Sequence, residues 1–140
     1  MLVVLDTNHF RELVQEGALG QKLLARIDEK RADVFISVVV AEESIRGWFA
    51  LLNREKPGHD QLLAYAELKR CFDSLAHFDL LEFDRDAADV FARLRKEFPR
   101  LGTMDLKIAA ICMAHDGLLL SRNLGDFNQI PGLRVENWLD

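Results

Sequence analysis

The sequence predicts an α/β sandwich with a mostly parallel central sheet and a helical hairpin, and two observations carry this prediction. Strand-like runs alternate with stretches of helical periodicity along the chain, which is the order of elements found in α/β proteins. Three of these runs are almost entirely apolar, as expected for parallel strands that are buried on both faces. They are Met1–Leu5, Val34–Val40 and Leu118–Leu120.

The first apolar run is followed by a helix that we expect to begin near His9. Thr7 and Asn8 have side chains that can accept a hydrogen bond from a helix N-terminus, so they are candidate caps. Gly17 and Gly20 then interrupt the apolar spacing, and a new amphipathic pattern starts between them. We therefore expect two helices between the first and second strands.

The second apolar run leads into a helix over Ala41–Leu52. The segment Lys56–His59 contains Pro and Gly and reads as a turn. Another long amphipathic pattern follows over Gln61–Leu75. Two helices joined by so short a turn are expected to pack as an antiparallel hairpin.

The third part of the chain alternates in the same way. Phe78–Phe83 reads as a short strand near an edge of the sheet, because charged residues interrupt it. Asp84 can cap a helix over Arg85–Phe98, and Thr103 can cap the very apolar helix after it. After the third apolar run, a polar loop leads to a last short strand at Leu133–Val135.

The composition sets limits on the class of protein. The chain has 140 residues, of which 49% are hydrophobic and 29% charged, so we expect one compact domain over residues 1–140. No apolar run approaches the roughly 18 residues that span a membrane, and no signal sequence is recognisable. We therefore expect a cytoplasmic protein without a membrane contact. Cys71 and Cys112 are too few for a cysteine metal site, and each is expected to be a buried free thiol.

Four acids stand where apolar runs give way to loops or helices: Asp6, Glu43, Asp105 and Asp126. In a parallel sheet the carboxyl ends of the strands share one edge, so a fold of this class can gather these acids. Four carboxylates in one pocket repel one another, and one or two divalent cations commonly offset that repulsion. Removing the four acids from the formal net charge of −5 leaves −1, so the rest of the surface has no strongly basic stripe.

Each acid also has a simpler explanation. Asp6 can be only a helix cap, and Asp105 can be only an acid that stabilises the first turn of a helix. Glu42 and Glu43 point about 100 degrees apart on a helix, so only one faces a given pocket, and spacing alone does not decide which. Asp126 lies in a segment that can be a polar surface loop.

The motifs around these acids resemble those of PIN-domain ribonucleases and, within that superfamily, VapC-type toxins of type II toxin–antitoxin pairs. The resemblance covers nearly the whole chain. It rests on LDTN at 5–8, ISVVVAEESIRG at 36–47, GTMDLKIAA at 102–110, SRNLGDF at 121–127 and IPGLRVENW at 130–138. The resemblance implies a PIN-like three-layer α/β/α sandwich and four acids that bind Mg²⁺ or Mn²⁺.

Carried over position by position, the resemblance implies that Asp6, Glu43, Asp105 and Asp126 are the catalytic and metal-binding quartet. It favours Glu43 over Glu42, because the acid in this family lies six residues after a strand Ser and four before a Gly. Glu43 has this spacing from Ser37 and Gly47. Asn8 and Ser121 match polar positions that assist the site, and Ser121 stands where Thr is more usual.

The function that the resemblance implies is metal-dependent cleavage of RNA by the toxin of a toxin–antitoxin pair. The partners it implies are an RNA substrate, a cognate antitoxin and a second copy of the chain in a homodimer. The hairpin over 41–75 is the expected antitoxin clamp. Arg46, Lys107 and Arg122 either contact RNA phosphates or are solvated surface cations.

Two other functions stay open from the residues. A phosphotransfer enzyme would use Asp6 as its nucleophile, although such sites usually have a second acid two residues later, where this chain has Asn8. A module that only binds protein or RNA would use the acids as helix caps and solvated loop residues.

Overall fold

The computed structural model describes residues 1–140 and contains five strands and seven α-helices. In chain order they are β1 (Leu2–Leu5), α1 (Thr7–Gln15), α2 (Ala18–Lys30), β2 (Asp33–Ser37), α3 (Val38–Arg54), α4 (Leu62–Leu75), β3 (Asp79–Leu81), α5 (Arg85–Glu97), α6 (Thr103–Ala114), β4 (Leu118–Leu120), α7 (Leu124–Phe127) and β5 (Arg134–Glu136). A short 3₁₀ turn at His59–Gln61 precedes α4.

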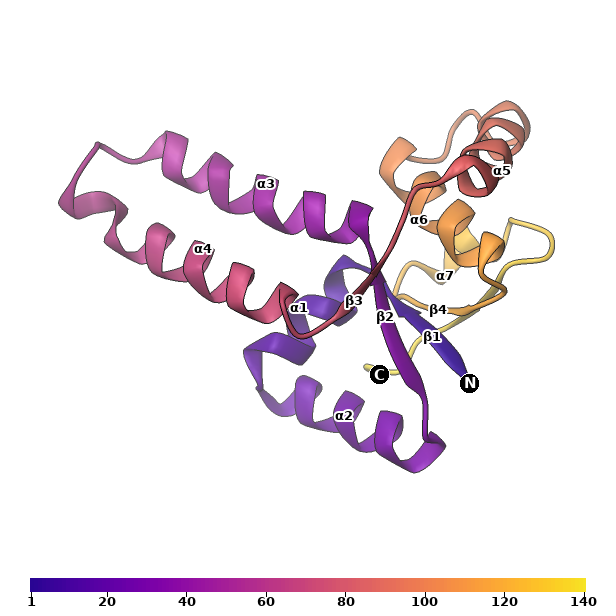
Figure 1. Ribbon diagram of the computed structural model, residues 1–140, viewed down its shortest axis with the longest axis horizontal. Coiled ribbons are helices and arrows are strands. Elements are labelled where there is room, and N and C mark those ends of the chain that lie inside the picture. Colours follow the sequence, from indigo (N-terminus) through magenta and orange to yellow (C-terminus); the bar gives the residue numbers. More distant parts are fainter.

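The five strands form one sheet in the order β3-β2-β1-β4-β5, and every neighbouring pair is parallel. The predicted parallel sheet is therefore confirmed. The three apolar runs supply its three middle strands, with Leu5 of β1 paired to Ile36 on one side and to Leu120 on the other. These middle strands are apolar on both faces because helices cover both faces, as Figure 1 shows.

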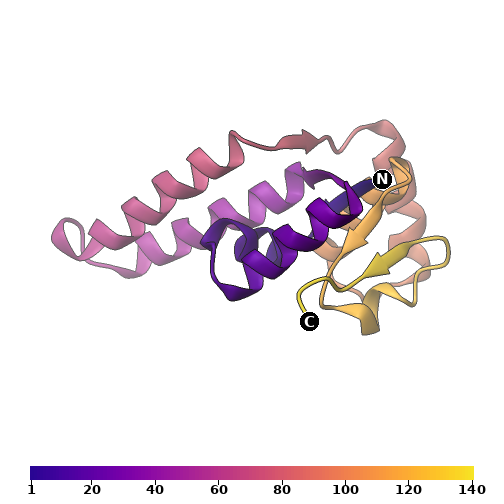
Figure 2. The same ribbon diagram turned by 90° about the horizontal axis from the view of Figure 1, so that it is seen from below.

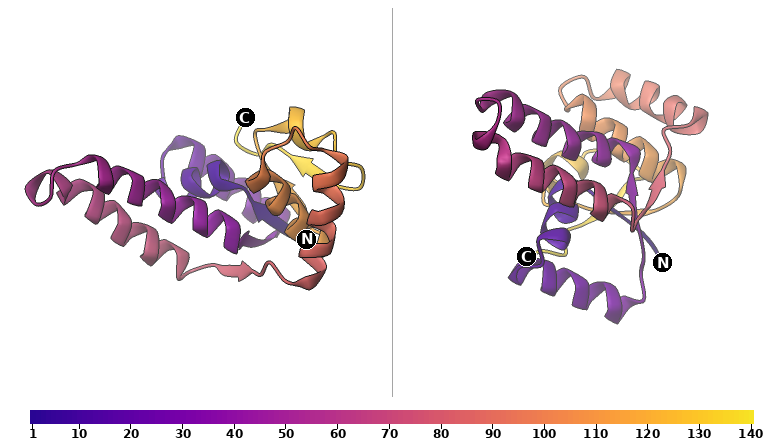
Figure 3. Two further views of the ribbon diagram at one scale, coloured as in Figure 1. Left: turned by 90° about the horizontal axis from the view of Figure 1, so that it is seen from above. Right: turned by 60° about the vertical axis from the view of Figure 1, so that its left-hand side comes forward.

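Helices α1 and α2 lie on one side of the sheet, and α5 and α6 lie on the other (Figure 1; Figure 3). The result is the expected three-layer arrangement. Helix α6 has buried residues around much of its circumference, including the unbroken stretch from Ile108 to Cys112, because it lies between the sheet and α5. This explains why its sequence is the most apolar of all the helices.

Helices α3 and α4 form the predicted antiparallel hairpin, which projects beyond the body of the molecule (Figure 2). It has a small core of its own, made by Leu52, Ala64 and Leu68. Near its far end Leu62 and Leu63 remain 67% and 69% exposed. No helix of the structure is both long and apolar enough to cross a membrane.

Several predicted boundaries are wrong, and each error involves a helix start. Helix α1 begins at Thr7, not near His9, and its cap is Asp6, whose Oδ1 accepts a hydrogen bond from the His9 backbone N–H at 2.9 Å. Strand β2 ends at Ser37 because the Ser37 hydroxyl accepts from the Val40 N–H, which turns the last residues of the apolar run into α3.

The third helix start was also misplaced, and one expected break is absent. Gly102 is the N-cap of α6, so Thr103 is the first helical residue and not a cap. Gly20 lies inside α2 and does not interrupt it. A Cβ atom there would approach the Glu12 carbonyl oxygen of α1 to 2.2 Å, so this glycine permits close packing of two helices.

Other local predictions are confirmed. β3 is an edge strand, and the Asp84 carboxylate caps α5 by accepting a hydrogen bond from the Ala87 N–H at 3.0 Å. The loop after β4 contains one feature that was not predicted, the short helix α7. Cys71 and Cys112 are buried free thiols, as expected.

Candidate active site

The sheet topology brings the four acids to one edge. Asp6 directly follows β1, and Glu43 lies in the helix that follows β2. Asp126 lies in α7, the short helix that comes after β4 and the loop at its end. Helix α6 runs back towards the start of β4, so its first turn, with Asp105, lies at the same carboxyl edge. Sites in parallel α/β sheets form at this edge.

The electrostatics of Asp105 show that the acids share one neighbourhood. Burial raises the pKa of the Asp105 carboxyl above its ordinary value, and the negative charges of Glu43, Asp126 and Asp6 raise it further. A hydrogen bond from Asn123 acts in the opposite direction. Three acids that are far from Asp105 in sequence therefore act on a single carboxyl group, as the parallel topology predicts.

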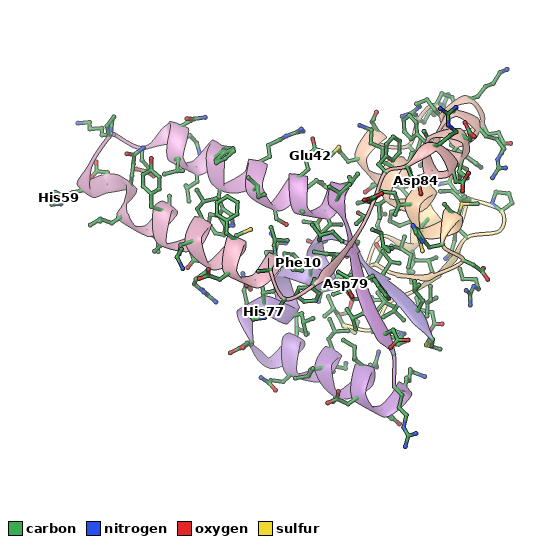
Figure 4. The ribbon with its side chains drawn as sticks, in the orientation of Figure 1. Phe10, Glu42, His59, His77, Asp79 and Asp84 are labelled. Carbon is green, nitrogen blue, oxygen red and sulfur yellow. The ribbon has the colours of Figure 1, made fainter.

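The structure distinguishes Glu43 from Glu42. Glu43 is half-buried, and its Oε1 accepts a hydrogen bond from the Thr7 hydroxyl of α1 at 2.9 Å. Glu42 is exposed and pairs with Arg46 one turn later on the same helix. Figure 4 shows Glu42 on the outer side of α3. Of the two acids, only Glu43 is directed towards α1 and the edge where Asp6 lies.

Asn123 links the other two acids of the site, Asp105 and Asp126. Its side-chain amide donates to Asp126 Oδ2 at 3.0 Å and lies 3.4 Å from Asp105 Oδ2. Ser121 is fully buried, and its hydroxyl accepts a hydrogen bond from the Asn123 backbone N–H at 3.0 Å. Ser121 thus shapes the turn that presents Asn123 and has no direct hydrogen bond with the four acids.

Asp6 has a partner that the sequence analysis missed. His9 is fully buried, and its Nδ1 lies 3.2 Å from Asp6 Oδ1. Asn8, which was expected to assist the site, is exposed and accepts a hydrogen bond from Arg11 at 2.6 Å. Its side chain has no hydrogen bond to any of the four acids in this structure.

The residues fit a hard divalent cation in their chemistry, since all four acids offer only oxygen ligands. No group of three or more His, Cys, Asp or Glu side chains is close enough together in this structure to hold a metal ion. Mg²⁺ usually retains several waters and binds through one or two carboxylates, so it does not need such a group. The like charges that act on Asp105 are the observation that favours a cation here.

The protein has a cavity of about 410 Å³, and of the four acids only Glu43 lines it. Its lining includes Thr7 and Glu43, and it lies between α1 and the α3–α4 hairpin. Its walls combine apolar side chains such as Trp48 with the cations Arg54 and Arg70. Figure 4 marks Phe10, another lining residue, where α1 meets the base of the hairpin.

The three cations that were expected either to contact RNA or to be solvated all have partners in the structure. Arg46 pairs with Glu42, and Lys107 lies 6.0 Å from the centre of the Phe91 ring. Arg122 makes two hydrogen bonds with the Asp140 carboxylate, at 3.1 and 3.2 Å.

Comparison with known proteins places this architecture in a family. The sequence model of the PIN domain matches residues 3–133. The chain belongs to the PIN domain family. This confirms the family that the motifs indicated, and the match extends from β1 to the residue before β5.

Individual PIN relatives point to one branch of the family. The chain is 29% identical over 139 residues to a ribonuclease VapC of Rickettsia bellii, covering 96% of this chain and 95% of the relative. It is 24% identical over 140 residues to ribonuclease VapC2 of Haemophilus influenzae, covering 97% of each. Among solved structures, VapBC2 from Rickettsia felis, bound to a DNA fragment from its promoter, superimposes with a TM-score of 0.77 at 22% identity, over 99% of each chain.

Proposed function

We propose that this protein is a divalent-metal-dependent endoribonuclease that acts in the cytoplasm as the toxin of a toxin–antitoxin pair. The similarity to ribonucleases named VapC over nearly the whole chain supports the reaction class. The observation that carries the proposal is that Asp105 lies at the same edge of the sheet as Glu43, Asp126 and Asp6: burial raises the pKa of its carboxyl first, and the negative charges of those three acids raise it further.

In this proposal Asp6, Glu43, Asp105 and Asp126 hold Mg²⁺ or Mn²⁺. When bound, such an ion activates water and offsets negative charge on the phosphodiester. The Thr7 hydroxyl orients Glu43. We assign Glu43 the further role of accepting a proton from the attacking water. Asn123 orients Asp105 and Asp126, and Ser121 and Asn8 assist from the loop after β4 and from α1.

The experiment is RNA cleavage by the purified protein, free of any partner, with and without divalent ions. We expect cleavage with Mg²⁺ or Mn²⁺ that leaves 5′-phosphate and 3′-hydroxyl ends, and none in excess EDTA. Asp6→Asn should abolish cleavage while the protein remains folded. Full cleavage in EDTA, or full activity of Asp6→Asn, contradicts the metal mechanism.

The proposed partner is an antitoxin that inserts a segment into the cavity between α1 and the hairpin. The apolar wall with Trp48 suits apolar anchors, and Arg54 suits an acidic side chain of a partner. Arg70 pairs with Glu67 in this structure and would exchange that carboxylate for one of the partner. Co-expression with the product of an adjacent short reading frame should give a stable inactive complex. Arg54→Glu combined with Arg70→Glu should weaken that complex and restore cleavage, and an unaffected complex argues against this surface.

We also propose a homodimer. The exposed apolar residues Leu62 and Leu63 on the hairpin offer surface that a second copy can cover. Sedimentation equilibrium should give twice the chain mass, and a monomer at high concentration contradicts this part of the proposal.

A further inference from the structure

His9 joins one of the proposed metal ligands to the far end of the chain. Its side chain is fully buried, with Asp6 on one side and the C-terminal segment on the other. The His9 Nδ1 atom lies 3.2 Å from Asp6 Oδ1. On the opposite side of the ring, the Trp138 backbone N–H donates a hydrogen bond to His9 Nε2 at 3.2 Å.

These two contacts determine which ring nitrogen carries the proton. A backbone N–H can only donate, so Nε2 must accept with its lone pair and cannot carry a hydrogen. The proton of the ring is therefore on Nδ1, from which it donates to Asp6 Oδ1. The other tautomer would place the Trp138 N–H against a second N–H and leave Asp6 facing a lone pair.

The same contacts make the two oxygens of Asp6 unequal. Oδ1 accepts from the His9 backbone N–H at 2.9 Å and from the His9 ring. Oδ2 receives no hydrogen bond from the protein. A carboxylate held by two donors on one oxygen cannot rotate freely, so its second oxygen is presented in a fixed direction.

We propose that His9 is a positioning residue for the reaction, which holds Asp6 so that Oδ2 alone is offered to the bound cation. The inference rests on the proposed function, because it assigns Asp6 to a metal site. His9 acts through Asp6, since its own ring is enclosed between Asp6 and Trp138. Its orientation is set by the C-terminal segment, 129 residues away in sequence.

The C-terminal segment is held firmly enough to fix the ring. Trp138 and Leu139 are buried, and the Trp138 indole N–H donates to Glu136 Oε1 at 3.1 Å. The Lys30 ammonium lies 5.7 Å from the centre of the Trp138 ring. These contacts leave the Trp138 N–H, and with it His9, little freedom to turn.

Two substitutions separate positioning from simple packing. In His9→Asn the amide nitrogen takes the place of Nδ1 and can still donate to Asp6, but the contact with Trp138 is lost. In His9→Gln the amide oxygen takes the place of Nε2 and can still accept from Trp138, but the donor to Asp6 is lost. Each variant loses one hydrogen bond, so a purely structural His9 predicts similar damage from both.

The first measurement uses the wild-type protein without metal. Long-range ¹H–¹⁵N correlation spectra of the histidine rings distinguish the two neutral tautomers, and His9→Asn assigns the signal. We expect the Nδ1–H form for His9. The Nε2–H form overturns the inference, whether or not the variants fold and whether or not the protein cuts RNA.

The second measurement compares the Mn²⁺ dissociation constant of the variants by calorimetry and their cleavage of RNA, after thermal melts have shown which variants fold. We expect His9→Gln to bind Mn²⁺ about 10-fold or more weakly and to lose kcat with little change in KM. His9→Asn should keep most of the wild-type affinity. Equal losses in both variants overturn the inference, whereas a wild-type protein that neither binds Mn²⁺ nor cuts RNA refutes the proposed function itself.

Discussion

Thr7→Val tests the hydrogen bond between α1 and α3 that orients Glu43. The Thr7 hydroxyl is the hydrogen-bond donor to Glu43 Oε1, at 2.9 Å, and no other side chain or backbone group bonds that oxygen. Valine keeps the branched shape of threonine and removes the donor. Glu43 should then lose its fixed orientation towards the site, although the fold is retained.

The size of the effect follows from the burial of the pair. A hydrogen bond to a charged group contributes about 1.5–3 kcal/mol when it is well shielded. Thr7 and Glu43 are both only half-buried, so water replaces part of the bond, and we expect a loss of about 1 kcal/mol in the free energy of unfolding, somewhat below that range. For 140 residues this corresponds to a Tm lower by about 3 °C.

The assay compares Thr7→Val with Thr7→Ser, which keeps the hydroxyl. Cleavage of RNA should fall about 10-fold or more in the valine variant, because a ligand loses the partner that orients it. The serine variant should remain close to wild type in cleavage and in Tm. Full cleavage by Thr7→Val, or equal losses in both variants, refutes the role assigned to this contact.

Three further predictions concern single side chains. Glu43→Gln should abolish cleavage, whereas Glu42→Gln should retain it, because Glu42 is exposed and pairs only with Arg46; the reverse pattern of activities contradicts this assignment. Burial and like charges raise the pKa of the Asp105 carboxyl in the folded protein above its value in the unfolded chain. The charged carboxylate therefore destabilises the metal-free fold at pH values above the folded-state pKa, and this effect disappears once the pH falls below the unfolded-state pKa. Asp105→Asn should therefore raise the metal-free Tm at pH 7 and lose this advantage in acid, and a lower Tm at pH 7 contradicts it. Burial raises the pKa of the Cys112 thiol to about 12, so Ellman's reagent should label Cys112 only after unfolding. Rapid labelling of Cys112 in the native protein contradicts the packing of α6.

The sequence predicted the layers and the sheet because these depend on local patterns. Three runs apolar on both faces became the three middle strands, since helices bury both faces of a parallel sheet. The positions of helix starts were less predictable. Val38–Val40 is β-branched and apolar, which favours a strand, but the hydrogen bond from the Val40 N–H to the Ser37 hydroxyl begins a helix there.

The positions of the acids were predictable in part, because they too depend on the parallel sheet. Asp6 and Asp126 follow from the edge that parallel strands share, whereas Asp105 stands at a helix start and was indicated by the family resemblance. The choice between Glu42 and Glu43 needed either that resemblance or the contact with Thr7. His9 could not be found from sequence, because its partner is the backbone N–H of Trp138 and carries no residue-specific signal. Asn8 remains a prediction for which the structure offers no contact with the acids.

The most direct test of the four-acid site is the thermal stability of the protein as Mn²⁺ is added. At an ion concentration of 100 times the dissociation constant, binding to the folded state alone should stabilise the wild type by about 2.7 kcal/mol. Glu42→Gln should respond in the same way, and Asp105→Asn should respond weakly or not at all. A wild-type Tm that does not change with Mn²⁺, or an equal rise in Asp105→Asn, contradicts the claim that these carboxylates form a metal site.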